Sequence, residues 1–264
     1  IEEQITPKTK VIMPVHIYGH PVDMDKVLEL AKKHDLKILG DFAEAQGAQY
    51  YSEKKGGKWV QCGSMSDIAA TSFYANKVIT TGEGGMVVTD NEEYARRARA
   101  YRNLYFGDEE RFNHAEIGYN FRMTNMQAAV GVARLEQMEK FIEIKRKNAE
   151  YYKSRLSKID QVRFITERPN TRSVYWVYAI QLRQGSSIDA KELMIRLRKC
   201  GIETRPFFKG MHKQPALIKE GLFKGEEYPK TDFAYKYGLY LPSGLALTEK
   251  QIDEIAKALK SILM

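Results

Sequence analysis

Hydrophobic and polar positions follow two different patterns along the chain. Between residue 11 and about residue 89, short apolar runs alternate with helical segments, which is typical of a parallel, doubly wound α/β sheet. The apolar runs predict four strands, at residues 11–15, 36–39, 68–72 and 86–89. Val27, Leu28 and Ala31 have helical spacing and predict a helix that begins after Asp23 as its N-cap. The first part of the chain therefore predicts an α/β lobe.

The second pattern begins with one long helix, predicted over residues 125–156. Its apolar stripe consists of Met126, Ala129, Val130, Ala133, Met138 and Ile142. A strand over 173–182 and a helix over 189–200 follow, and the capping box of Thr248 and Gln251 predicts a closing helix. Because a long helix commonly bridges two lobes, we place a domain boundary near residue 138. The prediction is a large domain over 1–137 and a small α/β C-terminal domain over 138–264.

Composition limits the class of protein. The chain has 264 residues, of which 43% are hydrophobic and 29% charged, as in soluble globular proteins. No apolar run reaches the roughly 18 residues that span a membrane, and the first residues do not resemble a signal peptide, so a cytoplasmic location is expected. Cys62 and Cys200 have no second cysteine nearby, which predicts buried or half-buried thiols and no metal site.

The net charge of +8 favours anionic partners. Such partners include nucleic acids and small phosphorylated molecules. The basic residues are interspersed with acidic ones, and no zinc finger or RNA-binding motif is present. The sequence therefore favours a phosphate-bearing ligand over nucleic acid.

Lys77 is the candidate reactive group. It follows the buried strand that ends at Ser72 and precedes a glycine-rich turn over 82–85. A lysine that attacks a carbonyl needs a fixed position and a lowered pKa, which the end of a buried strand can supply. A solvated lysine at a strand end is the simpler alternative. Against it, Asp41 and Ser72 also fall at the carboxyl ends of predicted strands, where ligands of such sheets bind.

A Schiff base between Lys77 and pyridoxal 5'-phosphate would need two further groups. The ring nitrogen needs a carboxylate, for which Asp41 is placed, and the phosphate needs donors such as the Ser72 hydroxyl. Asp41 would also suit a helix cap, and Ser72 alone is an ordinary strand-end serine. The turn over 82–85 lacks the Gly-Lys-Ser/Thr of a Walker loop, so its glycines are expected to shape the backbone beyond Lys77.

Several separated motifs carry a family resemblance. They read DFAEAQGA at 41–48, SFYANK at 72–77, TGEGGMVVT at 81–89, GYNFRMT at 118–124 and GLYLPSG at 238–244. With these motifs in this order, the chain resembles the DegT/DnrJ/EryC1/StrS family of pyridoxal-phosphate-dependent sugar-nucleotide aminotransferases. The resemblance implies fold type I, which is aspartate-aminotransferase-like, and it extends over essentially the whole chain.

The resemblance also implies residue roles. Lys77 would form the internal aldimine and carry the proton between cofactor and substrate. Asp41 would pair with the pyridinium nitrogen, Glu44 would lie beside the ring and its hydroxyl, and Ser72 would contact the phosphate. Asn120 would reach the phosphate of the neighbouring subunit, which implies a homodimer with shared active sites. Without the resemblance, Asn120 is equally well explained as a turn residue.

The expected reaction moves an amino group from glutamate to a keto-sugar nucleotide. Residues 203–208 (ETRPFF) and the following His212 resemble perosamine-synthase-like members, which aminate C4 of a GDP-linked 4-keto-6-deoxy sugar such as GDP-4-keto-6-deoxymannose. Arg205 and His212 are therefore expected near the sugar or its diphosphate, although a loop that packs two phenylalanines explains them equally well. Tyr18, with His16 and His20, is a further candidate for lining the pocket.

Family members carry a further N-terminal segment before the position of Ile1. It supplies the first helices and strand, a phosphate-binding turn and an aromatic residue that stacks on the ring. We therefore expect this chain to surround the cofactor only partly and to expose apolar sheet surface. Two alternatives stay open: an aminotransferase that acts at C3 of the sugar or on a cyclitol, and a non-catalytic binding or assembly fragment.

Overall fold

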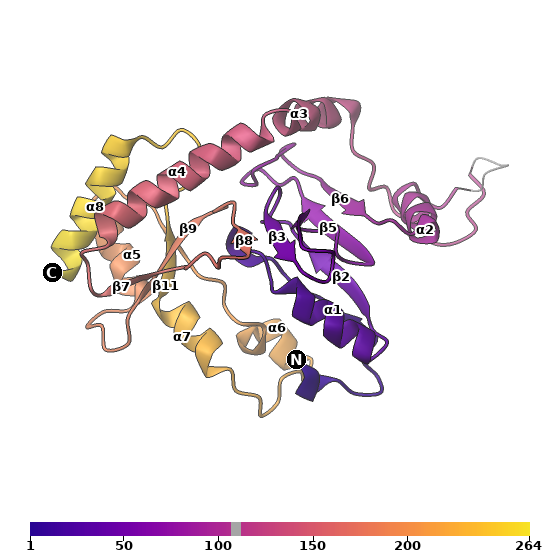
Figure 1. The fold of residues 1–264 in the computed structure, drawn as a ribbon, viewed down its shortest axis with the longest axis horizontal. Coiled ribbons are helices and arrows are strands. Elements are labelled where there is room, and N and C mark those ends of the chain that lie inside the picture. The colour runs from indigo at the N-terminus through magenta and orange to yellow at the C-terminus, as the bar shows by residue number, and fades with distance from the viewer. Residues whose placement is uncertain (107–111) are drawn as a thin grey trace. The chain divides into compact units, whose positions relative to one another are not determined.

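The computed structural model describes residues 1–106 and 112–264, and the chain forms two compact units (Figure 1). The first unit contains residues 1–143 and 167–176, and the second contains 144–166 and 177–264. The predicted boundary at residue 138 coincides with the start of α4 (Met138–Leu156), and the change of unit follows Glu143 inside this helix. The many aromatic residues between 101 and 121 indicate a loop, of which residues 107–111 lie outside the described residues.

The central sheet of the first unit has the strand order β1-β2-β5-β6. Its strands are β1 (Val11–Ile12), β2 (Lys37–Asp41), β5 (Ile68–Ser72) and β6 (Gly85–Val88). β1, β2 and β5 run parallel, whereas β6 pairs antiparallel with β5, so the prediction of a wholly parallel sheet is wrong for this strand. The reason is the short connection over 73–84: it contains no crossover helix, so the chain has to turn back beside β5.

A hairpin of two strands lies between β2 and β5, where the polar stretch at 54–58 (KKGGK) indicates only a loop. It consists of β3 (Gln49–Ser52) and β4 (Lys58–Gln61), and β3 also pairs with β8 (Thr171–Arg172). Tyr50 and Ser52 face inward while their neighbours are more exposed, which is the alternation of a strand with one covered face. The buried side chains of β3, Tyr50 and Ser52, carry hydroxyl groups, so no run of apolar residues predicts these strands.

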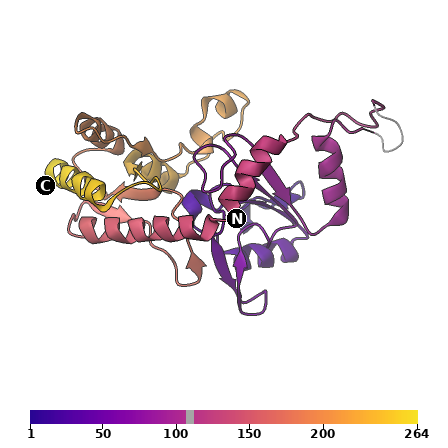
Figure 2. The ribbon, with the colours of Figure 1, turned by 90° about the horizontal axis from the view of Figure 1, so that it is seen from above.

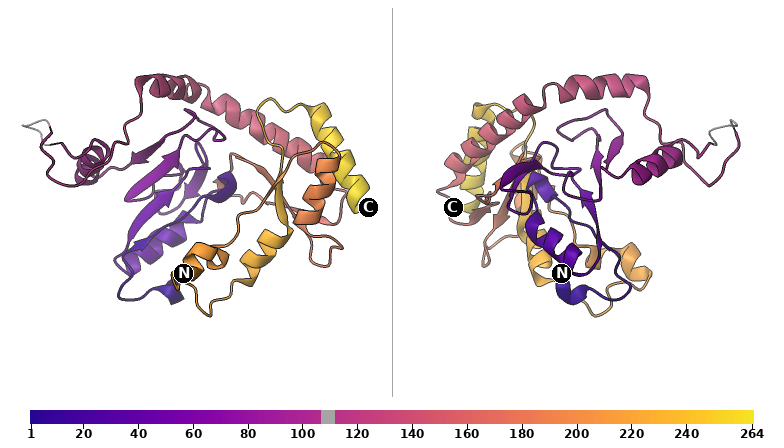
Figure 3. Two further views of the ribbon diagram at one scale, coloured as in Figure 1. Left: turned by 180° about the vertical axis from the view of Figure 1, so that it is seen from behind. Right: turned by 45° about the vertical axis from the view of Figure 1, so that its right-hand side comes forward.

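The core of the first unit forms where α1 (Met24–Lys33) packs against β1, β2 and β3, as Figures 2 and 3 show from two further sides. Its buried side chains are Ile12, Met24, Val27, Ala31, Leu36, Ile38, Tyr50 and Met65. The predicted helix is confirmed, and Asp23 precedes it, but the Asp23 side chain does not cap it as expected. The Asp23 carboxylate accepts a hydrogen bond from the Tyr50 hydroxyl (2.8 Å) and caps no backbone N–H of α1.

The helix predicted over 125–156 is two helices. α3 (Asn125–Leu135) ends before Glu136, and α4 begins at Met138, although no glycine or proline marks the break. α3 has no buried residue, so the predicted apolar stripe is exposed at Met126 and Val130 and becomes buried at Ile142. α2 (Glu92–Arg102) precedes this region and was not predicted.

The second unit contains an antiparallel sheet of order β10-β11-β9-β7. The strands are β10 (Arg205–Pro206), β11 (Gly238–Leu241), β9 (Tyr178–Leu182) and β7 (Val162–Phe164), and the helices besides α4 are α5 (Ala190–Lys199), α6 (Pro215–Lys219), α7 (Pro229–Tyr237) and α8 (Glu249–Leu263). The strand predicted over 173–182 is shorter, because it starts only at Tyr178. The predicted α5 and the capping box of α8 are confirmed.

Exposed apolar side chains occur on the central sheet of the first unit and next to it. Val11 and Met13 are exposed at β1, and Met86 and Val87 are exposed on β6, as the sequence predicted for part of this surface. Cys62 is a buried free thiol as expected, but Cys200 is exposed. Within the described parts of the chain, no helix has the length and apolar character needed to cross a membrane.

Candidate active site

Lys77 lies in the connection between β5 and β6. The Phe73 N–H donates to the Gly84 carbonyl (2.8 Å), and the Lys77 N–H donates to the Tyr74 carbonyl (3.0 Å), so both ends of the segment and its middle are held by backbone hydrogen bonds. Gly84 has φ = 139°, a conformation that favours glycine. The next residues, Val78 and Ile79, are buried and anchor the connection in the core.

The Lys77 amine lies against a carboxylate and an indole. Its Nζ is 3.8 Å from Glu44 Oε1 and 4.1 Å from the centroid of the Trp176 ring. Only 11% of the Lys77 side chain and 12% of the Glu44 side chain are exposed. Burial lowers the pKa of Lys77, and the negative charges of Glu44 and Asp41 act in the opposite direction. The amine is therefore neutral at lower pH than a solvated lysine, as a nucleophile requires.

Glu44 joins this amine to the turn after β1. Its Oε2 accepts a hydrogen bond from the Tyr18 N–H (2.6 Å), and Tyr18 is a buried residue with φ = 57° in the short 3-10 turn Ile17–Gly19. Burial raises the pKa of Glu44, while the Tyr18 N–H and Lys77 oppose this effect. Desolvation thus outweighs the mutual attraction at both groups, raising the pKa of Glu44 and lowering that of Lys77.

Asp41 is the last residue of β2 and lies at the edge of the sheet where β1 also ends. Its N–H donates to the Pro14 carbonyl (2.9 Å), and its carbonyl accepts from the His16 N–H (2.9 Å). The carboxylate accepts from the Ala43 N–H (2.9 Å) within a turn. No helix follows among residues 42–48, so the helix-cap alternative is wrong for Asp41. The carboxylate acts electrostatically on Glu44, Lys77 and His16.

Ser72 ends β5, the strand that pairs in parallel with β2. Its hydroxyl accepts a hydrogen bond from the Tyr74 N–H (3.1 Å) and is half-buried. Asp41 and Ser72 therefore lie at the carboxyl ends of two neighbouring parallel strands, as the sequence predicted, and this is where ligands of open α/β sheets bind. Together with Glu44, Lys77 and Tyr18 they form the candidate site.

Gln46 supports the Lys77 connection and was missed by the sequence analysis. It is buried, and its amide donates to the Ser72 carbonyl (2.8 Å) while its Oε1 accepts from the Ile79 N–H (2.8 Å). The Gln46 side chain therefore joins the two ends of the stretch 72–79, which carries Lys77. Gln46 was visible inside the motif at 41–48, but nothing in the sequence distinguished a buried glutamine there from an exposed one.

Asn120 is exposed and lies outside this group of contacts. Its backbone bridges to Asn103, and its Oδ1 accepts a hydrogen bond from Arg122 Nε (3.0 Å). Within residues 1–106 and 112–264, no described hydrogen bond or ion pair joins Asn120 to Lys77 or Asp41. Its role toward a cofactor stays a prediction.

Arg205 and His212 belong to the second unit. Arg205 is exposed, and its guanidinium donates to the Thr204 carbonyl (3.0 Å) and to Glu203 (3.3 Å). His212 is buried, and its Nε2 lies 2.8 Å from Asp232 Oδ1. As substrate contacts, Arg205 and His212 stay predictions.

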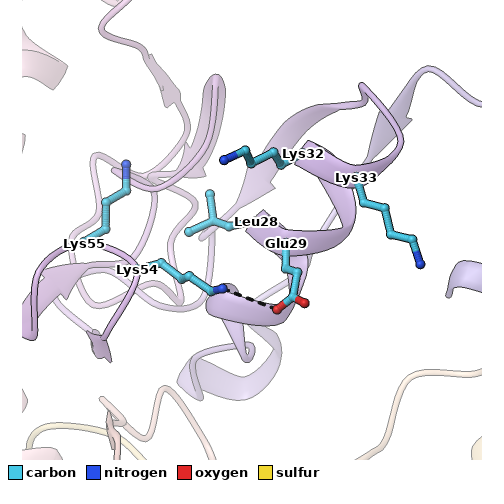
Figure 4. A pocket seen from close by; sticks show the side chains of 6 residues that line it. All are labelled: Leu28, Glu29, Lys32, Lys33, Lys54 and Lys55. Carbon is cyan, nitrogen blue, oxygen red and sulfur yellow. Dashed lines mark ion pairs between the residues drawn. The ribbon is translucent and has the colours of Figure 1, made fainter.

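A separate hollow lies between α1 and the turn that joins β3 to β4 (Figure 4). It is lined by Leu28, Glu29, Lys32, Lys33, Lys54 and Lys55. Lys54 pairs with Glu29 (3.5 Å), and Lys33 pairs with Glu2 (2.6 Å), so two of its lysines are neutralised by neighbouring acids. None of the predicted site residues lines this hollow.

Comparison with known proteins places the chain in a family. Residues 1–260 match the model of the DegT/DnrJ/EryC1/StrS aminotransferase family. The GDP-perosamine synthase of Caulobacter vibrioides is 37% identical over 270 residues, which cover 100% of this chain and 69% of that protein. The dTDP-3-amino-3,4,6-trideoxy-alpha-D-glucose transaminase of Streptomyces venezuelae is 32% identical over 262 residues, covering 98% of this chain and 65% of that protein.

A solved structure agrees with these matches. The DesV protein of S. venezuelae superposes with a TM-score of 0.87 at 32% identity, covering 99% of this chain and 67% of that one. The chain belongs to the DegT/DnrJ/EryC1/StrS aminotransferase family, and its fold is that of the fold-type I sugar aminotransferases. It spans about two thirds of the length of these relatives.

Proposed function

We propose that the protein is a pyridoxal-phosphate-dependent aminotransferase that moves an amino group from glutamate to a keto-sugar nucleotide. The observation that carries this proposal is the buried Lys77 amine, 3.8 Å from Glu44 at the carboxyl edge of a parallel sheet. The 37% identity to a GDP-perosamine synthase supports GDP-4-keto-6-deoxymannose as the acceptor.

The residues at this edge suit the cofactor chemically. Lys77 offers an amine whose pKa burial lowers, Asp41 offers a carboxylate for the ring nitrogen, and Ser72 offers a hydroxyl for the phosphate. Pyridoxal phosphate, when bound, supplies an electron sink for the substrate carbon. We assign to Asn120 a contact with the phosphate bound by a neighbouring copy, so the proposed active form is a homodimer.

The protein's own contribution is proton transfer at Lys77 Nζ. A neutral Nζ would be the nucleophile toward the aldehyde carbon of the cofactor, and a free Nζ would accept and return a proton as a general base and acid. Desolvation lowers the pKa of this amine, while Glu44 and Asp41 oppose the shift and keep the amine able to hold a proton. Glu44 is in turn fixed by the Tyr18 N–H.

Substrate recognition is assigned to charged and aromatic side chains. The exposed Arg205 guanidinium has the geometry and charge that bind a diphosphate, and Tyr18 belongs to the turn that contacts Glu44. His212 is paired with Asp232, which orients its ring. We propose Arg205, His212 and Tyr18 as contacts to the sugar nucleotide.

Covalent capture of the cofactor tests the assignment of Lys77. The purified protein is incubated with pyridoxal phosphate, reduced with borohydride and mapped by peptide mass spectrometry. We expect the phosphopyridoxyl group on Lys77, its loss in Lys77→Ala and its retention in Lys55→Ala, a control lysine in the exposed turn between β3 and β4. If the group is not found on Lys77, the enzyme proposal is wrong for this chain, and a non-catalytic binding or assembly role replaces it.

A second candidate is amination at C3 of the sugar. The 32% identity to the dTDP-3-amino-3,4,6-trideoxy-alpha-D-glucose transaminase supports it. Product analysis with GDP-linked 4-keto and dTDP-linked 3-keto sugars separates the two. Amination at C4 of the GDP-linked sugar alone supports the main proposal, and amination of the dTDP-linked 3-keto sugar alone supports the second.

A further inference from the structure

Trp176 makes two contacts with the segment that carries Lys77. It is buried with 5% exposure and lies between β8 and β9, within the part of the chain that belongs to the first unit. Its indole Nε1–H donates to the Asn76 carbonyl (2.8 Å), and its ring centroid lies 4.1 Å from Lys77 Nζ. The two contacts therefore fall on the peptide before Lys77 and on the reactive amine itself.

The position of Trp176 is fixed by the same turn that fixes Glu44. The Val174 N–H and the Ser173 hydroxyl both donate to the Gly19 carbonyl, at 3.1 and 3.0 Å. Gly19 has φ = 83°, and a Cβ built there would lie 2.9 Å from the Trp176 backbone nitrogen, so the two segments are in close contact. Because the neighbouring Tyr18 N–H holds Glu44, both partners of Lys77 Nζ are placed by one turn.

A ring face beside an amine has two opposing effects. The negative face of an indole attracts an ammonium ion, and this attraction is strong where water is excluded. The same ring excludes water from the amine, which disfavours its charged form. Among the described residues, Glu44 and Asp41 are the charged groups that act on Lys77. The indole is therefore the apolar partner of an amine whose other neighbours are carboxylates.

We propose that Trp176 is a positioning residue for Lys77: its N–H fixes the peptide that precedes the lysine, and its ring face holds the ammonium beside Glu44. The contribution to amino transfer rests on the proposed function, whereas the effect on the amine belongs to the protein without cofactor. A tryptophan that only fills space would affect stability without selectively changing the pKa of Lys77.

Two substitutions separate the N–H from the ring face. Trp176→Phe keeps an aromatic face and loses the donor, and Trp176→Met keeps apolar bulk but loses both. We expect Trp176→Phe to speed amide hydrogen exchange in residues 73–80 with little change in the pKa of Lys77. Trp176→Met should also speed exchange and in addition lower that pKa by about one unit, since the attraction to the ring is lost.

The pKa of Lys77 is measured by competitive acetylation of the cofactor-free protein as a function of pH. Mass spectrometry follows the Lys77 peptide relative to that of Lys55, an exposed lysine of the same unit. Trp59→Phe is the matched control, because Trp59 is 48% exposed on β4, and it should change neither exchange nor pKa. Circular dichroism confirms that each variant is folded.

The inference is overturned if folded Trp176→Met leaves the pKa of Lys77 as in the wild type, or if Trp176→Phe leaves exchange over residues 73–80 unchanged. Failure of the proposed function looks different. In that case wild-type protein does not capture pyridoxal phosphate on Lys77, whatever the acetylation experiment shows.

Discussion

The Lys77 connection and the region around α3 belong to the same unit but differ in their support. Two buried side chains hold the Lys77 connection: Gln46 bonds to Ser72 and Ile79, and Trp176 bonds to the Asn76 carbonyl and contacts the amine. In contrast, α3 has no buried residue, and Ile117 and Met126 are 85% and 81% exposed. α3 reaches the Lys77 connection through polar side chains, since Gln127 Nε2 donates to the Glu83 carbonyl (3.4 Å) and Arg134 donates to the Val78 carbonyl (3.2 Å), while its apolar side chains stay exposed.

The difference in packing between these two regions matches the roles proposed for their residues. Asp41, Glu44, Ser72 and Lys77 are the residues proposed to act within their own subunit, and they lie in or beside the packed region. Asn120, which we propose to act in a neighbouring copy, lies beside exposed apolar side chains such as Phe121, which is 71% exposed. Four predictions test this contrast, from the largest expected effect to the smallest.

Lys77→Arg should remove the chemistry while leaving a positive charge beside Glu44. A guanidinium does not lose its proton at neutral pH and therefore supplies neither nucleophile nor base. We expect turnover of the cofactor-loaded protein to fall by at least about 10²–10⁴-fold, the usual contribution of general acid–base catalysis. Steady-state kinetics measures it, and turnover within tenfold of the wild type would contradict the role of Lys77.

Gln46→Leu should loosen the packed region. It leaves the Ile79 N–H and the Ser72 carbonyl without their partner, and each buried polar group left unsatisfied costs about 1–3 kcal/mol. We expect the free energy of unfolding to fall by roughly 2–6 kcal/mol in urea titrations. Gln137→Leu, at an exposed position between α3 and α4, is the matched control and should change stability little. Equal effects of the two substitutions would show that Gln46 does not hold the connection.

Acid should lower the free energy of unfolding through protonation of the buried His16 side chain. This side chain is 1% exposed, and burial lowers its pKa from 6.5 to about 4, with Asp41 opposing the shift. The unfolded chain therefore binds more protons between these values, so stability is lost as pH falls from 6.5 toward 4. Between pH 7 and pH 5 the loss from His16 is about 2 kcal/mol.

Urea unfolding of wild type and His16→Asn at the two pH values measures this loss. Asparagine does not titrate, and its amide oxygen replaces the acceptor that His16 Nδ1 offers to the Val22 N–H. The difference between the two pH values should therefore shrink in the variant. An identical pH dependence in both proteins would assign the acid sensitivity to other groups.

Met126→Ala should have the smallest effect. Met126 is exposed on α3, and substitutions at exposed sites usually change the free energy of unfolding by no more than about 0.5 kcal/mol. Unfolding at low protein concentration should therefore show nearly wild-type stability. A loss that appears only at high concentration would show that a second copy covers α3, which would sharpen the contrast with the Lys77 connection.

The sequence predicted those features that depend on local signals. The capping box of Thr248 and Gln251 predicted α8, and the helices α1 and α5 were also predicted. Asp41 and Ser72 end neighbouring strands as expected, and Lys77 lies in the connection after β5. The strand β3 was not predicted, because its inward side chains Tyr50 and Ser52 are polar at their tips. The antiparallel orientation of β6 follows from the short connection over 73–84, whereas no glycine or proline marks the break before Met138. Trp176 was missed because its partner Asn76 is 100 residues away.

The antiparallel pairing of β5 and β6 sets an order in which the site assembles. The ladder joins residues close in the chain, such as Ser72 with Gly85, so little loop entropy opposes its formation. The bond from Trp176 to Asn76 spans 100 residues and also needs the turn at Gly19 in place. During synthesis on the ribosome, the lysine connection can therefore form well before its indole partner has emerged. Until then the amine lacks the ring face that covers it in the folded protein.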